Sequence, residues 1–310
     1  MHLTVTRRAE AADGVIALTL ARPDGGPLPV WQPGAHVELL LGDGLVRHYS
    51  LCGDPADRSG WRIAVLRAAE SRGGSAYVHD KLHVGAHVRV RGPRENFAFR
   101  PAGRCLFVAG GIGITPLLPM IAAAEAAGTE WRLLYGGRTL GSMAFLGELS
   151  LYGDAVRVVP QDRFGLPDLD GFLGAPQEGT LVYCCGPESM LSAVEDRCRA
   201  WPEGALQVER FQAAELPPHA AESAFDVVLT GSDLTLRVPP GRSILEVARE
   251  AGVPVLSSCA EGICGTCETE VLEGEPDHRD SVLSTEERES GETMMICVSR
   301  AHSPQLVLDL

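Results

Sequence analysis

Four cysteines near the C-terminus have the spacing of a metal-cluster site. Cys259, Cys264 and Cys267 form a C-x4-C-x2-C run, and Cys297 follows much later in the chain. This is the plant-type pattern for a [2Fe–2S] cluster, in which each iron takes two protein thiolates. Two glycines inside the run suit a loop that wraps such a centre, because glycine permits positive φ. A cluster of this kind carries one electron at a potential on the order of −400 mV, so the run predicts an electron-transfer site.

Other uses of these cysteines fit less well. A zinc site usually shows two C-x2-C pairs, or one pair with histidines, whereas this chain has one such pair and no suitably spaced histidines. A disulfide framework is typical of small secreted chains, and the sequence starts without a secretory leader. Most of the other five cysteines are expected to be buried thiols in a reducing compartment; they are Cys52, Cys105, Cys184, Cys185 and Cys198.

A second group of candidate residues lies in the first third of the chain. Arg47, Tyr49 and Ser50 stand in Arg-His-Tyr-Ser-Leu at the end of a predicted strand. An arginine there can neutralise a phosphate, an aromatic ring can pack on a flat ring, and a hydroxyl can hydrogen-bond a ring nitrogen. Gly74 and Ser75 precede a predicted short helix at 76–82, whose N-terminal N–H groups can bind an anion. Together the two motifs indicate a flavin.

Two glycine turns form a third group. Gly-Gly-Ile-Gly-Ile-Thr-Pro at 110–116 lies between a predicted strand and a helix, and Cys-Gly-Pro-Glu at 185–188 follows a later strand. Neither is the G-x-G-x-x-G fingerprint. Even so, each places bare backbone at the carboxyl end of a parallel strand, where dinucleotides bind. A generic strand-to-helix turn is the alternative.

The elements that must position these residues fall into three segments. Residues 1–102 read as an all-β barrel with turns between short strands; strands are predicted at 15–20, 35–41, 61–66 and 84–90. Residues 103–213 alternate strand and helix, which predicts a parallel sheet; strands are predicted at 105–109, 131–135, 156–159 and 180–184, and helices at 117–127, 143–149 and 189–199. Residues 214–224 form a Pro/Ala linker, and residues 225–310 start with a hairpin and a helix at 243–251 with a capping box.

Composition narrows the function classes. The chain has 310 residues and a net charge of −14, which argues against nucleic-acid binding. Residues 225–310 carry 16 acidic residues against 6 arginines, an excess that would steer a basic partner toward the cysteine segment. The sequence shows no apolar run long enough to span a bilayer, and a soluble, cytoplasmic protein is expected.

Taken in order, these motifs resemble one family. RHYSL, GGS, GGIGITP, CCGPESM and the cysteine loop are similar to the corresponding motifs of the phthalate dioxygenase reductase family. The resemblance covers essentially the whole chain. It implies a multidomain protein of the ferredoxin–NADP reductase superfamily: an antiparallel β-barrel flavin domain, an α/β nucleotide domain with a parallel sheet, and a C-terminal α+β ferredoxin domain of β-grasp type.

The resemblance also implies roles for individual residues. FMN would be held by Arg47, Tyr49, Ser50, Gly74, Ser75 and Phe211. NADH would bind at Gly111, Gly113, Thr115, Pro116, Arg138, Thr139, Gly186 and Pro187. Ser50, Cys185 and Glu188 would be the catalytic residues beside the reacting rings, and Cys259, Cys264, Cys267 and Cys297 would ligate the [2Fe–2S] cluster.

The implied activity is that of an NADH-dependent reductase component of a multicomponent oxygenase. A flavin must lie between NADH and the cluster because it alone handles both one and two electrons. A Rieske non-haem iron oxygenase is the expected partner, docking at the acidic ferredoxin segment of a monomer, and a cytochrome P450 is the alternative. FAD and NADPH remain alternatives to FMN and NADH. A redox-sensing or electron-storage module and a structural zinc protein are the other classes left open.

Overall fold

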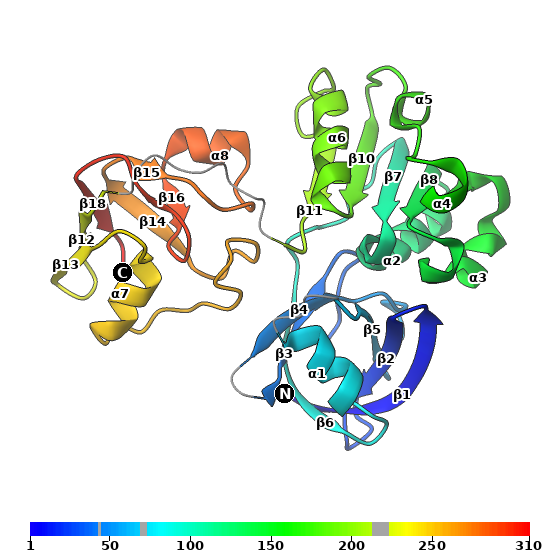
Figure 1. Cartoon of the computed structure of the whole chain (residues 1–310), viewed down its shortest axis with the longest axis horizontal. Helices are drawn as coiled ribbons and strands as arrows, with labels where there is room; N and C mark the ends of the chain where they lie inside the picture. The colour runs from blue at the N-terminus through cyan, green and yellow to red at the C-terminus, as the bar shows by residue number, and fades with distance from the viewer. Residues whose placement is uncertain (43–44, 69–72, 213–222) are drawn as a thin grey trace. The chain divides into compact units, whose positions relative to one another are not determined.

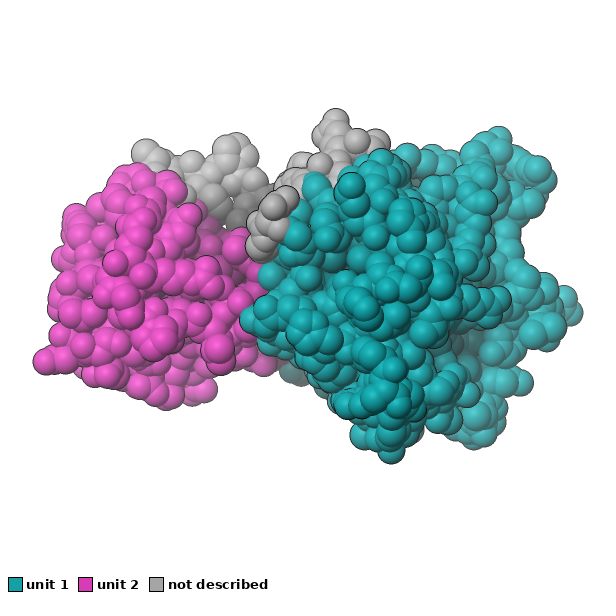
Figure 2. Space-filling view, turned by 90° about the horizontal axis from the view of Figure 1, so that it is seen from below, with its two compact units in different colours: residues 1–209 teal, residues 210–310 magenta. Residues whose placement is uncertain are grey.

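The computed structural model describes residues 1–42, 45–68, 73–212 and 223–310, which fall into two compact units (Figure 2). The first unit is Met1–Glu209 and the second is Arg210–Leu310. The first contains a six-stranded antiparallel sheet and a five-stranded parallel sheet, and the second contains a mixed five-stranded sheet and a two-stranded one. Most of the predicted linker at 214–224 lies outside the described residues.

The antiparallel sheet runs in the order β4-β3-β6-β1-β2-β5 (Figure 1). Its strands are β1 (His2–Ala12), β2 (Val15–Ala21), β3 (His36–Leu40), β4 (Val46–Ser50), β5 (Trp61–Leu66) and β6 (His87–Arg94). Alternate residues such as Leu18 and Leu20 are fully buried, as expected for strands with one face on a core. Beyond the end of β4, the amide of Cys52 donates to the carbonyl of Arg62 on β5 at 2.8 Å, so the sheet curls until its two edge strands meet there.

The predicted strands of this sheet are confirmed except for one boundary. The strand predicted at 84–90 begins later, because Val84 and Gly85 belong to a turn in which Gly85 has φ 90°. The amide of Ala86 closes that turn on the carbonyl of His83 at 2.9 Å. Between β5 and β6, the predicted helix is present as α1 (Gly74–Lys81).

The parallel sheet runs in the order β11-β10-β7-β8-β9. Its strands are β7 (Arg104–Gly110), β8 (Glu130–Gly137), β9 (Val156–Pro160), β10 (Thr180–Cys185) and β11 (Leu206–Glu209). The helices around it are α2 (Ile114–Ala126), α3 (Leu146–Leu149), α4 (Gln161–Phe164), α5 (Leu169–Leu173) and α6 (Glu188–Cys198). Phe107 on β7 packs in the same cluster as α2, while its neighbours Leu106 and Val108 pack in the cluster that includes α5 and α6. Burial on both faces explains the continuous apolar run of β7.

The helix predicted at 143–149 is shorter than expected. Helix α3 begins only at Leu146, because Phe145 adopts a left-handed conformation with φ 63° and Met143 is extended. A one-turn 3-10 helix, η3 (Leu140–Ser142), precedes this break. The other predicted strands and helices of the parallel sheet are confirmed to within a few residues.

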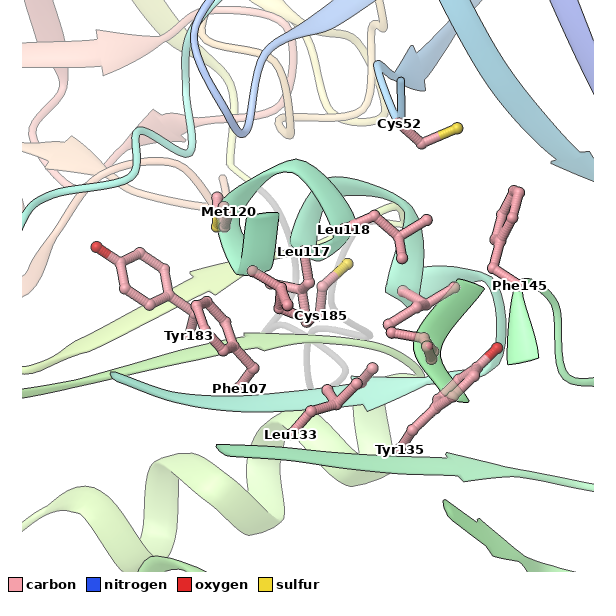
Figure 3. Packing of buried hydrophobic residues seen from close by; sticks show 14 of the residues in the cluster. Cys52, Phe107, Leu117, Leu118, Met120, Leu133, Tyr135, Phe145, Tyr183 and Cys185 are labelled. Atoms are coloured by element: carbon pink, nitrogen blue, oxygen red, sulfur yellow. The ribbon is translucent and has the colours of Figure 1, made fainter. Parts of the chain in front are cut away.

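The two sheets of the first unit share one hydrophobic cluster. Val15, Cys52 and Ala64 from the antiparallel part are buried with the parallel-sheet residues that pack on α2. Figure 3 shows Cys52 beside Phe145 and Leu118 in this cluster. The hydroxyl of Tyr183 on β10 accepts from the amide of Arg100 at 2.8 Å. The sheets therefore form one packed body, which fixes the ends of their strands relative to one another.

The second unit is built on a sheet in the order β13-β12-β18-β14-β16. Its strands are β12 (Phe225–Leu229), β13 (Leu234–Val238), β14 (Glu268–Glu273), β16 (Thr293–Met295) and β18 (Gln305–Leu308), and a small pair is formed by β15 (Pro276–Asp277) and β17 (Arg300–Ala301). Its helices are α7 (Ile244–Glu250) and α8 (Thr285–Ser290). The predicted capping box is confirmed, since the amide of Glu246 donates to Ser243 Oγ and the Ser243 amide to Glu246 Oε2.

Membrane-spanning segments were also sought. Among the described residues, no helix has the length and apolar character needed to cross a bilayer.

Candidate functional site

The four cysteines of the C-terminal motif come together in the second unit. Cys264, Cys267 and Cys297 are buried, and Cys259 is partly exposed. The side chain of Cys259 contacts those of Cys264 and Cys297, and Cys267 contacts Cys297. The tertiary fold thus closes the gap in sequence between Cys267, before β14, and Cys297, after β16.

The contacts among these thiols shift their pKa values in opposite directions, and the Cys264 thiol also donates to Thr266 Oγ1 at 3.2 Å. Close contact with Cys264 and Cys297 lowers the pKa of Cys259 well below its usual value and raises the pKa values of Cys264 and Cys297. The contacts link the four side chains in the order Cys264, Cys259, Cys297 and Cys267. Within the part of the chain that is described, no set of three or more His, Cys, Asp or Glu side chains converges as a single metal ion would require. Four neighbouring thiols fit a two-iron centre, in which each iron takes two thiolates.

The backbone of the cysteine loop explains its glycines. Gly262 has φ 70° and Gly265 φ 71°, values that L side chains rarely adopt. A Cβ atom on Gly262 would also lie 2.6 Å from Val298 Cγ2 and 3.0 Å from Asp280 Cα. Both positions therefore require glycine because of their positive φ, as the sequence predicted. Gly262 is also required because a side chain there would clash with its neighbours.

A buried carboxylate supports the segment behind this loop. The side chain of Asp280 is fully buried, and its Oδ2 accepts from the amides of Val282 and Leu283 at 2.9 and 2.8 Å. Arg288 donates to the Asp280 carbonyl at 2.6 Å. The amide of Ser281 in turn donates to the carbonyl of Gly262 at 2.8 Å. Asp280, which was not among the predicted residues, thus organises the turn on which the cysteine loop rests.

The residues that were predicted to bind a phosphate lie together in the first unit. The side chain of Arg47 lies over the start of α1: a Cβ atom on Gly74 would come within 2.5 Å of Arg47 Cγ. Gly73 before the helix is left-handed, with φ 86°. The hydroxyl of Ser75 accepts from the amide of Ala68 at 3.1 Å. A guanidinium beside a glycine helix start is a cradle that fits a phosphate.

Tyr49 and Ser50 continue from this cradle along β4. Tyr49 packs against the core of the antiparallel sheet, and burial raises its pKa to about 12. Ser50 is the last residue of β4 and is 5% exposed. Its hydroxyl makes no well-formed hydrogen bond within the described chain. A buried hydroxyl with unused hydrogen-bonding capacity fits a polar edge of a bound ring.

Glu209 is a site residue absent from those predicted. It ends β11, directly beside Cys185 of β10 in the parallel register. Burial raises the pKa of Glu209 to about 8, and the adjoining hydroxyl of Ser50 lowers it only in part. Its Oε2 atom is buried and makes no well-formed hydrogen bond in the described residues. The sequence feature that could have indicated Glu209 is its position as an acidic residue at the end of a strand, just before Arg210 and Phe211.

Cys185 completes this group. It is fully buried, pairs with Ala109 of β7 on its other side, and lies in the cluster with α2. Burial raises its pKa well above the usual value of a thiol, so Cys185 is a neutral thiol. The structure therefore brings together Ser50, Cys185 and Glu209 from three separate strands.

The two glycine turns meet at the carboxyl ends of β7 and β10. A Cβ atom on Gly113 would lie 2.2 Å from the carbonyl oxygen of Cys185, and one on Gly110 would lie 2.4 Å from Pro187 Cδ. A Cβ atom on Gly186 would lie 3.0 Å from the backbone of Gly110. Gly111 differs, because a Cβ atom there would meet nothing within 4 Å. Three glycines thus permit close packing, while Gly111 leaves open space for a ligand.

The remaining residues of the first turn hold its shape. Thr115 and Pro116 are buried in the first turn of α2, and the Thr115 hydroxyl donates to the carbonyl of Ile112 at 3.0 Å. The hydroxyl of Tyr135 donates to the carbonyl of Gly111 at 3.1 Å. Hydrogen bonds from Thr115 and Tyr135 therefore hold the backbone at Ile112 and Gly111 in place.

Arg138 and Thr139 lie at the carboxyl end of β8, where both are exposed. Thr139 caps η3, accepting from the amide of Ser142 at 3.2 Å. The carbonyl of Arg138 accepts from the amide of Asp162 at 3.0 Å. This contact places Asp162 and the exposed ring of Phe164, neither of them among the predicted residues, on the same edge of the sheet.

Glu188 and Phe211 are less constrained. Glu188 lies in the first turn of α6 and accepts from Ser192 Oγ at 3.3 Å. Phe211 follows the first unit by two residues, and its side chain is 38% exposed. The predicted roles of both residues stay predictions.

The chain is similar to known proteins along its whole length. Residues 227–302 match the 2Fe-2S iron-sulfur cluster binding domain family. Phenoxybenzoate dioxygenase subunit beta of Ectopseudomonas oleovorans is 44% identical over 313 residues, which cover 100% of this chain and 97% of that protein.

Two solved structures show the same architecture over the full chain. Phthalate dioxygenase reductase, described as a modular structure for electron transfer from pyridine nucleotides to [2Fe–2S], is 37% identical with a TM-score of 0.74, and 100% of this chain and 98% of that one are covered. An intact type IV self-sufficient cytochrome P450 monooxygenase is 45% identical with a TM-score of 0.92 over 100% of this chain. This chain spans only 41% of that P450.

Proposed function

Since this chain belongs to the phthalate dioxygenase reductase family and is an oxidoreductase with a C-terminal iron–sulfur domain, we propose that it is the reductase component of an oxygenase system. In this proposal electrons pass from NADH to FMN, then to a [2Fe–2S] cluster, and then to a terminal oxygenase. The observation that carries the proposal is the convergence of Ser50, Cys185 and Glu209 at the ends of β4, β10 and β11, which supports a flavin on β4 next to a nucleotide on the parallel sheet.

FMN is proposed to lie along β4 on a closed antiparallel barrel formed by residues 1–102. Arg47 and the start of α1 at Gly74 and Ser75 would hold its phosphate, and Tyr49 would lie against the ring. The Ser50 hydroxyl, buried with no well-formed hydrogen bond, would bond the polar edge of the ring. When bound, a flavin supplies the change from two-electron to one-electron transfer. The chain itself supplies orientation and exclusion of water.

Glu209 is proposed to hold a proton beside the reacting rings. With a pKa of about 8 it is mostly protonated at neutral pH, so its carboxyl can donate a hydrogen bond. The neutral thiol of Cys185 fills the adjacent position without bringing in a charge. Glu188, further along the same turn, is proposed as a polar contact to the nicotinamide amide.

NADH is proposed to bind across the nucleotide domain, residues 103–213. Its diphosphate would approach the open backbone at Gly111, and its adenosine would lie between Arg138 and Phe164. The backbone amide of Asp162 donates to the carbonyl of Arg138 on this edge. A carboxylate there suits the free 2′-hydroxyl of NADH and repels the 2′-phosphate of NADPH. Exchange of Asp162 for Asn should therefore improve the use of NADPH relative to NADH.

The ferredoxin domain, residues 225–310, is proposed to have a β-grasp fold and to hold the cluster by its four cysteines. We assign Cys259 and Cys264 to one iron and Cys267 and Cys297 to the other, because a side-chain contact joins each of these pairs; a third contact joins Cys259 and Cys297. The acidic surface of this domain would attract a basic face of the partner. The nine cysteines of the whole chain, none of them in a disulfide, support the proposal of a reducing, cytoplasmic location.

A Rieske non-haem iron oxygenase is the first candidate partner, because a similar chain is a subunit of phenoxybenzoate dioxygenase. A cytochrome P450 is the second candidate. It is favoured by the self-sufficient P450 monooxygenase, whose matching part has a TM-score of 0.92 with this chain. Reduction of purified oxygenases of both classes under the same conditions would decide between them.

The proposal is tested by the visible spectrum of the purified protein under anaerobic conditions. Flavin and iron–sulfur absorption, both bleached within seconds by NADH, are expected. Bleaching by NADPH alone would reverse the choice of nucleotide. A protein that shows neither absorption after cluster reconstitution and addition of FMN would contradict the proposed function.

A further inference from the structure

Arg62 connects the antiparallel-sheet half and the parallel-sheet half of the first unit, and it makes several contacts in addition to an ion pair. It lies on β5 of the antiparallel sheet, and its guanidinium binds both carboxylate oxygens of Glu148 on α3, at 2.6 and 2.9 Å. The same guanidinium lies over the ring of Phe145, 4.9 Å from its centre. One arginine therefore holds the loop after β8 by a two-point ion pair and a cation–π contact.

The other side of Arg62 is bound to the flavin strand. Its Nε and Nη2 both donate to the carbonyl of Cys52, at 3.0 and 2.5 Å, and its own carbonyl accepts from the Cys52 amide. Cys52 follows Ser50 by two residues. A displacement of the Arg62 side chain would thus shift the end of β4, where Ser50 lies beside Glu209.

The loop that Arg62 holds, residues 138–149, begins at the proposed adenosine contacts. After Arg138 and Thr139 it touches the antiparallel sheet a second time, because the amide of Asp13 donates to the carbonyl of Gly141 at 2.8 Å. A Cβ atom on Gly141 would lie 2.4 Å from Asp13 Oδ2, so a side chain there would displace the Asp13 carboxylate. The loop is thus fixed to the antiparallel sheet at both ends.

The left-handed Phe145 shows what this attachment requires. A non-glycine residue with φ 63° is strained, yet this conformation breaks the predicted helix and brings the ring under Arg62. Half-exposed ion pairs contribute little to stability, and the shared hydrophobic cluster already joins the sheets. The contacts of Arg62 instead specify an orientation.

We propose that Arg62, with Glu148 and Phe145, is a positioning device that sets the distance between the nucleotide-binding loop and the flavin strand for hydride transfer. The inference rests on the proposed function. Hydride transfer requires reacting atoms at about 3–3.5 Å, and a misplacement of about 1 Å can slow such a step roughly a hundredfold. Arg62 is a positioning residue, since it acts through Cys52 and through the loop.

Two variants separate charge from geometry. Arg62→Lys keeps the charge but cannot bind a carboxylate at two points, lie flat on Phe145 and donate twice to Cys52 at once. Glu148→Gln keeps the size and removes the charge. The matched control is Asp170→Asn, which breaks the two-point pair with Arg197 at 2.7 and 3.1 Å inside the parallel-sheet half.

The rate of flavin reduction at saturating NADH, measured by stopped flow in the holoenzyme, should fall ten- to a hundredfold in Arg62→Lys and less in Glu148→Gln. The apparent Kd for NADH should change less than threefold. A readout independent of turnover is the long-wavelength charge-transfer absorption formed with a non-reducing tetrahydro analogue of NADH, which should weaken in Arg62→Lys. The thermal unfolding midpoint should shift no more than that of Asp170→Asn.

Full reduction rates and an unchanged charge-transfer band in Arg62→Lys would overturn the inference. So would a slower rate explained wholly by lost flavin or by a lower unfolding midpoint. Failure of the proposed function looks different, because the wild-type protein itself would then not be reduced by NADH.

Discussion

At the residue scale, the proposed chemistry depends on a few side chains whose surroundings change their properties. Glu209 is a carboxyl that stays protonated near neutral pH, and Cys185 is a thiol that stays neutral; burial is the main cause for both. Arg47 lies beside the start of α1 at Gly74. Neutral groups at the rings and a cation at the phosphate are what a flavin site needs.

The raised pKa of Glu209 predicts a pH dependence of stability. Its pKa is about 8 in the folded protein against an ordinary value of 4.5, so the folded state holds the proton more tightly. The stabilising effect is complete below about pH 4.5 and is lost as the pH rises through about 8. Glu209→Gln should therefore show a smaller drop in unfolding midpoint between about pH 5.5 and 8.5 than the wild type.

The control for Glu209 is Glu203→Gln, an exposed residue of the same half, which should keep the wild-type pH dependence. An identical pH dependence in Glu209→Gln would mean that the carboxyl ionises normally.

Arg47→Ala should weaken FMN binding. Loss of a charge-assisted contact to a phosphate costs roughly 1.5–3 kcal/mol, or about ten- to a hundredfold in Kd. Fluorescence titration of the flavin-free protein with FMN measures it. Arg89→Ala, which removes an exposed arginine of β6, is the control and should bind normally. An equal affinity in both variants would remove Arg47 from the site.

At the element scale, the site depends on how closely two turns approach. The turn after β7 and the turn after β10 pack backbone on backbone, which only glycines allow. Their strands are adjacent and parallel, with Ala109 opposite Cys185. The glycine motif is thus first a packing requirement, and Gly111 alone faces open space.

Gly113→Ala should destabilise the first unit. The added methyl would lie 2.2 Å from the carbonyl oxygen of Cys185, and overpacking of this kind costs about 1–3 kcal/mol. Gly147→Ala is the matched control, because a Cβ atom there meets nothing within 4 Å on helix α3; it should be neutral or slightly stabilising. Urea unfolding of the two variants compares them, and equal midpoints would contradict the packing argument.

At the scale of the whole molecule, the two proposed cofactor sites belong to separate compact units. Ser50, Cys185 and Glu209 lie in residues 1–209, whereas all four cluster cysteines lie in residues 210–310. Each unit has its own hydrophobic core among the described residues. Loss of one site should therefore leave the other intact.

Cys264→Ser tests this independence. The variant should lose the iron–sulfur absorption and its electron paramagnetic resonance signal after reduction, while FMN stays bound and is still reduced by NADH at the wild-type rate. Loss of flavin from the same variant would show that the units depend on each other.

The sequence by itself determined the parts of this protein that depend on neighbouring residues. The cysteine run, the glycine turns, the capping box at Ser243 and most strands were predictable, because ligand spacing, φ and alternation are local constraints. The helix predicted at 143–149 was wrong at Phe145 because the conformation of this residue does not follow from its sequence neighbours. Phe145 is left-handed, and its ring contacts Arg62, which is distant in the sequence.

Only the tertiary structure decided which distant residues meet. Glu209 becomes a site residue because the parallel register of β10 and β11 places it beside Cys185, and because packing of the two sheets brings Ser50 against it. Arg62 joins the nucleotide loop to β4 for the same reason. Strand register and sheet packing are set by the whole hydrophobic core, so no spacing in the sequence could indicate them.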